Sequence, residues 1–178
     1  RVEVFAATKP LGRSEAANQL LDMARSEFAL FLDDDDWLLP DHIERLVQAH
    51  RSHPEVVAAY AGVECLRQKG QTLERVKLFD EPISRAQMQL RNGLPIHSTL
   101  LRLEVVQRAP TVRFNTALLY FEDWDFWLQL MDRGDFVRVP GVSAAYLISD
   151  SEGSGHEVSS ARRREMLEIF GHFRLARW

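Results

Sequence analysis

Short apolar segments alternate with amphipathic helical segments over the first sixty residues, and this alternation restricts the fold more than any other feature. Residues 2–5, 28–32 and 56–60 have the length and composition of strands. Apolar side chains recur at helical spacing over about 14–25 and again after Pro40. This β-α-β-α-β order predicts an α/β protein with a mostly parallel sheet flanked by helices.

The later sequence predicts a second group of elements around a less regular middle stretch at about 67–95. We expect helices at 84–91 and 124–133, an extended segment at 97–102, and strands at 136–139 and 142–148. Residues 1–150 are predicted to form one α/β domain. Residues 151–178 are predicted to form a polar loop and a C-terminal helix.

Composition excludes several classes of protein. The chain has 178 residues, suited to one domain. Its 26 acidic and 22 basic residues give a net charge of −4, so we expect no nucleic-acid partner. One cysteine, Cys65, excludes an internal disulfide and a multi-cysteine zinc site. No apolar run reaches the ~20 residues that span a bilayer. We therefore expect a cytoplasmic protein, with association at the inner face of a membrane left open.

Four consecutive aspartates, Asp33 to Asp36, follow the apolar segment 28–32 directly. In open α/β sheets, ligands bind beyond the carboxyl ends of the strands. Adjacent carboxylates repel one another, and a hard divalent cation such as Mg²⁺ or Mn²⁺ takes oxygen ligands of this kind. The alternative is an acidic loop in which Asp35 or Asp36 only caps the helix near Pro40. The preceding strand and following helix favour a ligand site.

Two enzyme classes place Asp-x-Asp at such a strand end. In HAD-type phosphohydrolases, Asp33 would be the nucleophile and Asp35 the acid/base. That class also requires a small residue soon after the pair, where this chain has Trp37, and a later lysine, a residue type that occurs only three times here. In GT-A glycosyltransferases, the aspartates serve a metal-bound nucleotide sugar.

The chain resembles the family 2 glycosyltransferases of GT-A fold over about residues 2–148. Two motifs 87 residues apart carry the resemblance, and the segment 92–98 resembles the loop between them. The first motif comprises Gly12, Ser14, Ala16, Asn18 and Ala24, then Phe31-Leu32-Asp33-Asp34-Asp35-Asp36 and Pro40. The second is Glu122-Asp123-Trp124-Asp125-Phe126-Trp127.

The resemblance implies a donor site at the first motif. Asp35 and Asp33 match the metal-binding Asp-x-Asp, with Mn²⁺ or Mg²⁺ as the cofactor. Asp34, Asp36 and Asn18 would join Asp33 in binding a nucleotide-diphosphate sugar. His156 matches a histidine that binds the metal in some GT-A enzymes.

The resemblance also implies an acceptor site at the second motif. Asp123 matches the general base, with Glu122 beside it, and His97 and Trp124 would lie on the acceptor side. The implied reaction is an inverting transfer to a hydroxyl group of a saccharide or lipid-linked acceptor. A base on the hydroxyl and a metal on the leaving diphosphate are the two groups that this chemistry needs. The alternatives are a helix cap for Asp123 and a core position for Trp124.

Three features depart from the family pattern. Gln129 replaces the usual arginine of the second motif, and Leu147 follows Tyr146 where arginine or histidine is common. Residues 2–5 read as the third strand of the fold, so we expect a chain truncated at its amino end. These departures leave a third hypothesis open, a non-catalytic GT-A remnant that binds a saccharide or a partner chain.

Overall fold

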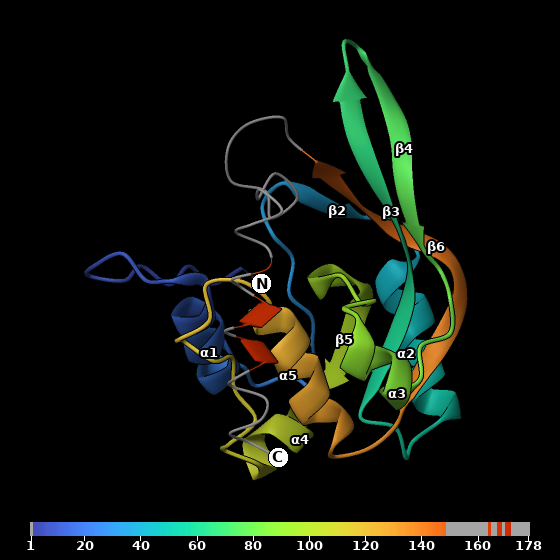
Figure 1. Cartoon of the computed structure of the whole chain (residues 1–178). Helices are drawn as coiled ribbons and strands as arrows, with labels where there is room; N and C mark the ends of the chain where they lie inside the picture. Colours follow the sequence, from blue (N-terminus) through green and yellow to red (C-terminus); the bar gives the residue numbers. More distant parts are fainter. Residues whose placement is uncertain (1, 149–163, 165–166, 169, 172–178) are drawn as a thin grey trace.

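The computed structural model describes residues 2–148, 164, 167–168 and 170–171, and the described chain is an α/β structure built on one six-stranded sheet (Figure 1). The helices are α1 (Arg13–Met23), α2 (His42–Ser52), α3 (Arg85–Leu90), α4 (Leu103–Arg108) and α5 (Glu122–Met131), with a 3₁₀ turn η1 (Ile96–Ser98). The strands are β1 (Phe28–Ala29), β2 (Asp36–Leu38), β3 (Ala58–Lys69), β4 (Thr72–Phe79), β5 (Thr99–Arg102) and β6 (Phe136–Ile148).

The sheet is mixed, so the prediction of a mostly parallel sheet is wrong. The strand order is β1-β5-β3-β6-β2, with β4 also paired to β3, and β3 with β6 is the one parallel pair among these pairings. The turn between β3 and β4 has two residues, and Gly70 takes a positive φ of 63° in it. So short a connection imposes antiparallel pairing, and the two strands form the long hairpin at the top of Figure 1.

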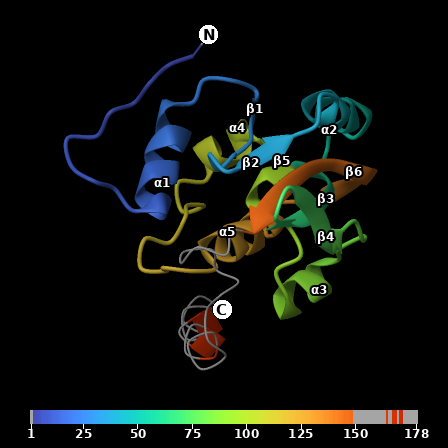
Figure 2. The ribbon, with the colours of Figure 1, turned by 90° about the horizontal axis from the view of Figure 1, so that it is seen from above.

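Two helical layers cover the sheet (Figure 2), and consecutive residues at the start of β3 are buried on both of its faces. Ala58 and Tyr60 belong to the core cluster formed with α5, α1 and α4. Ala59 and Ala61 belong to a second cluster with Leu46 of α2. Successive β3 side chains therefore pack against opposite layers. None of the described helices has the length and apolar character needed to cross a bilayer.

Most predicted helices are confirmed to within a few residues, as α1, α2, α3 and α5. The strand predicted at 56–60 is the start of β3, and the two strands predicted after 136 are one strand, β6. The sequence prediction missed α4, β2 and β4.

The strand predicted at 2–5 is wrong. These residues form no strand, and Val2 and Val4 are 90% and 89% exposed. The described residues of the C-terminal segment are helical, and Phe170 among them is buried. The predicted polar loop lies outside the described residues.

Two buried histidines link stability to pH. His42 is fully buried, with Nδ1 2.7 Å from the Ser143 hydroxyl, and burial lowers its pKa from 6.5 to about 4. Burial also lowers the pKa of His50, whose Nε2 lies 2.9 Å from the Leu100 carbonyl oxygen. Both side chains are therefore neutral in the folded protein at neutral pH.

We predict that His42 makes the protein less stable as the pH falls from 6.5 to 4. The unfolded chain binds a proton at His42 below pH 6.5, whereas the folded chain does not until about pH 4. Chemical denaturation from pH 8 to pH 4 measures the free energy of unfolding. Its loss on acidification should be smaller in His42→Gln than in the wild type, by up to about 3 kcal/mol. His53→Gln, at an exposed histidine, should follow the wild type. If the free energy of unfolding falls equally with pH in the wild type and in His42→Gln, His42 is not the source of the acid-dependent loss.

Candidate functional site

The two acidic motifs face one cavity of about 360 Å³. Asp33, from the connection between β1 and β2, and Asp36, the first residue of β2, line one part of it. Glu122 and Asp123, at the start of α5, line another part. The fold thus brings together carboxylates from motifs that lie 87 residues apart in the sequence.

Three of the four consecutive aspartates form a cluster. One carboxylate oxygen each from Asp33, Asp35 and Asp36 lies within 4.8 Å of the others, whereas the exposed Asp34 is outside the cluster. Burial, followed by repulsion from Asp36, raises the pKa of Asp33, and the nearby Arg13 partly offsets this effect. Three oxygen ligands with excess negative charge suit a hard divalent cation, so the residues present fit Mg²⁺ or Mn²⁺.

Asp36 lies beside a buried histidine. Its Oδ2 lies 2.9 Å from Nδ1 of His97, an ion-pair distance without hydrogen-bond geometry, and the His97 side chain is 1% exposed. His97 lines the cavity and lies in η1, directly before β5. The structure therefore brings the predicted acceptor-side histidine into contact with the aspartate cluster.

The second motif begins α5 with an unusual backbone conformation. Phe121, the residue before the helix, takes a left-handed φ of 64°, which is costly for a side chain of this size. Glu122 and Asp123 then occupy the first turn, where the helix dipole favours negative charge. Asp123 is thus inside the helix and is not its capping residue.

Both carboxylates of this motif have defined partners. Glu122 forms an ion pair with Arg13 of α1 at 2.8 Å, and burial raises its pKa. Asp123 Oδ1 accepts from the Trp124 backbone N–H at 2.7 Å, and Oδ2 accepts from the Asn92 side chain at 2.9 Å. Burial raises the pKa of Asp123, and the Asn92 bond is the largest effect that lowers it.

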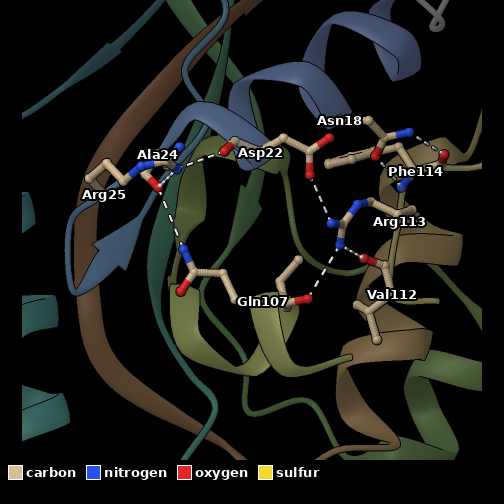
Figure 3. A network of polar contacts seen from close by, with 9 residues as sticks. Asn18, Asp22, Ala24, Arg25, Gln107, Val112, Arg113 and Phe114 are labelled. Atoms are coloured by element: carbon tan, nitrogen blue, oxygen red, sulfur yellow. Dashed lines mark hydrogen bonds and ion pairs between the residues drawn. The ribbon is translucent and has the colours of Figure 1, made fainter. Parts of the chain in front are cut away.

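Two predicted site residues, Trp124 and Asn18, do not line the cavity. Trp124 is 5% exposed, donates from Nε1 to the Met88 carbonyl oxygen at 2.6 Å, and stacks on Phe170 with ring centroids 4.5 Å apart. Asn18 bonds the backbone N–H and carbonyl of Phe114, both at 2.9 Å (Figure 3), and does not line the cavity. His156 lies outside the described residues. The cavity thus gives no support to the acceptor-side role of Trp124 or the donor-binding role of Asn18, and the metal-binding role of His156 stays a prediction.

The sequence analysis missed several residues that line the cavity. Arg13 and Tyr146 belong to elements that were predicted, but no motif marked them. Lys77 and Phe79 lie on β4, with the Lys77 ammonium group 4.0 Å from the centre of the Phe79 ring. Strand pairing places four residues side by side across β4, β3, β6 and β2, in the order Lys77, Cys65, Tyr146 and Asp36. Predicting β4 and its pairing with β3 from the sequence would have placed Lys77 beside the site.

Comparisons with known proteins identify the family of this chain. The sequence model of the family described as glycosyl transferase family 2 matches residues 1–108, and the chain belongs to this family. Family membership sets aside the phosphohydrolase interpretation.

Two curated relatives are similar over most of this chain. The amylovoran biosynthesis glycosyltransferase AmsE of Erwinia amylovora is 29% identical over 71% of this chain and 46% of its own length. An uncharacterized glycosyltransferase of Haemophilus influenzae is 27% identical over 70% of this chain and 42% of its own length. The chain thus spans less than half the length of these relatives.

Solved structures of Staphylococcus aureus TarS share the fold. TarS 1–349 in complex with UDP-GlcNAc matches with a TM-score of 0.59 at 15% identity, covering 79% of this chain and 40% of the TarS 1–349 chain. The complex of TarS 1–349 with UDP matches with a TM-score of 0.55 at 16% identity, covering 78% of this chain and 40% of the TarS 1–349 chain. The expected GT-A-like α/β fold is therefore confirmed.

We predict that Asn18→Ala lowers stability and leaves nucleotide affinity nearly unchanged. The substitution removes both partners of the Phe114 backbone groups, which should cost about 2 kcal/mol of unfolding free energy. Gln107→Ala, which removes only a 3.5 Å contact to Ala24, should cost less than about 0.5 kcal/mol. Denaturant unfolding gives both values. A large loss of UDP affinity in folded Asn18→Ala would instead support the predicted donor-binding role.

Proposed function

We propose that this chain carries the donor and acceptor sites of an inverting glycosyltransferase that uses a divalent metal ion. The sugar would move from a nucleotide-diphosphate donor to a hydroxyl group of a saccharide or lipid-linked acceptor. The observation that carries the proposal is the convergence of Asp33 and Asp36 with Glu122 and Asp123 on one cavity. Family membership supports it, as do the complexes of TarS with UDP and UDP-GlcNAc.

The donor side is assigned to the aspartate cluster. Asp33 and Asp35 would hold Mg²⁺ or Mn²⁺, with Asp36 beside them. When bound, the metal supplies a positive charge that stabilises the departing nucleoside diphosphate. The buried His97 lies beside Asp36, with its Nδ1 2.9 Å from Oδ2 of the carboxylate.

The acceptor side is assigned to Asp123. Its carboxylate removes the proton of the acceptor hydroxyl as that oxygen forms a bond to the anomeric carbon of the sugar. The bond from this carbon to the diphosphate breaks on the opposite face, which inverts the configuration. Burial raises the pKa of Asp123 towards the working pH, which makes it a more effective base while it stays ionised. The Glu122–Arg13 pair supports the same edge of the cavity.

Asp35→Ala should abolish metal-dependent nucleotide binding. Calorimetric titration of UDP and GDP with and without Mn²⁺ should show affinity that requires the metal in the wild type and is at least about tenfold weaker in Asp35→Ala. Asp34→Ala is the matched control: the resemblance implies donor binding for Asp34, but this exposed carboxylate lies outside both the cluster and the cavity lining. Equal losses in both variants would contradict the assignment of Asp35 to the metal.

Asp123→Asn should keep donor binding and lose turnover. The amide cannot take the proton from the acceptor, so the rate should fall by about 10²–10⁴-fold. Release of nucleoside diphosphate from a panel of UDP- and GDP-sugars measures the rate, and calorimetry measures donor affinity. Asp135→Asn, at an exposed carboxylate that does not line the cavity, serves as the control. Undiminished turnover in Asp123→Asn would reject the base, and a wild type that binds donor without turnover would support the non-catalytic remnant.

A further inference from the structure

The loop after α3 contacts the second acidic motif through Asn92. Its Nδ2 donates to Asp123 Oδ2 at 2.9 Å, and Asn92 also lines the cavity. Its Oδ1 accepts from the Leu94 backbone N–H at 3.3 Å. Because this bond requires the amide oxygen, it fixes the amide so that the NH₂ group faces Asp123. Asn92 therefore presents a donor, and not an acceptor, to the carboxylate.

Two tryptophans of α5 bind the chain on either side of Asn92, one at α3 and one at the loop after it. Trp124 Nε1 donates to the Met88 carbonyl oxygen at 2.6 Å, and Trp127 Nε1 donates to the Leu94 carbonyl oxygen at 3.1 Å. Gly93 packs closely as well, since a Cβ there would lie 2.3 Å from the Ile83 side chain. The helix that carries Asp123 thus also fixes the backbone that carries Asn92.

The two donors to Asp123 together restrict the rotation of its carboxylate. Oδ1 accepts from the Trp124 N–H, and Oδ2 accepts from Asn92. Each carboxylate oxygen has two lone-pair directions, so one remains on each oxygen for a further partner. Asp123 lines the cavity, where an acceptor hydroxyl can supply that partner.

We propose that Asn92 is the positioning residue for Asp123: its amide fixes the carboxylate in the orientation from which it receives the acceptor's proton. This inference rests on the proposed function and adds a residue to its acceptor side. A hydrogen bond to the ionised form also keeps a buried carboxylate charged at neutral pH. Asn92 therefore acts on both the direction and the protonation state of the base.

Asn92→Ala tests the inference through the pH profile of the reaction. Loss of the donor should move the acid limb of the profile up by about one pH unit and lower the rate at pH 7 about tenfold. The donor KM should change less than about twofold, because Asn92 acts through Asp123 and not through the metal cluster. Asn92→Asp keeps the shape of the side chain and replaces the donor with a like charge, so its acid limb should move further.

Asn115→Ala is the matched control. Asn115 Oδ1 accepts from the Ala117 backbone N–H at 3.0 Å, the same local turn that Asn92 forms with Leu94. Asn115 lies outside the cavity, so its loss should leave the pH profile unchanged. If both alanine variants change stability alike and neither moves the acid limb, Asn92 is only a turn residue and the inference is wrong.

A carboxyl-carbon NMR titration of Asp123 separates this inference from the proposed function. In protein labelled with ¹³C at aspartate, the Asp123 pKa should rise in Asn92→Ala and stay unchanged in Asn115→Ala, with or without substrate. An unchanged Asp123 pKa in Asn92→Ala overturns the inference whatever the turnover. A raised pKa in Asn92→Ala, combined with a wild type that transfers no sugar, overturns the proposed function and with it the catalytic role of Asn92.

Discussion

The structure depends on keeping several carboxylates close together in a partly buried cavity. Burial raises the pKa of Asp33, Glu122 and Asp123, and repulsion from neighbouring carboxylates adds to the effect at Asp33 and Glu122. Arg13 opposes the shift at all three, and it pairs directly with Glu122. A divalent cation at the aspartate cluster would relieve part of the remaining repulsion. This charge distribution supports the proposed metal site.

The packing of α5 gives this cavity a rigid edge. Every residue from Trp124 to Met131 is buried, so the helix is surrounded by core side chains and begins at the cavity. The left-handed Phe121 directs the chain into the helix, and the two indole N–H groups hold the neighbouring loop. A base at the start of such a helix moves little, which is what an in-line displacement requires. The aromatic residues of the motif thus position the acidic ones.

The sequence predicted the features that depend on local pattern. The main helices follow from apolar spacing, and the meeting of the two motifs followed from the family resemblance. Strand pairing was less predictable. The antiparallel pairing of β4 with β3 produces no periodic pattern of apolar residues in the sequence. All of β4 but its last residue is exposed, so it shows no inward-outward alternation. Residues 2–5 alternate apolar and polar side chains at their start as a strand does, but they pair with none of the described strands. Asn92 and Arg13 could not be found because their roles arise from contacts between distant segments.

Crystals soaked with Mn²⁺ and UDP test the central claim most directly. The account predicts an anomalous Mn²⁺ peak at the Asp33, Asp35 and Asp36 carboxylates, with the diphosphate bound in the cavity that Asp123 lines. A Mn²⁺ peak only at other surface carboxylates, or UDP bound outside this cavity, would contradict the claim that the two acidic motifs form one transfer site.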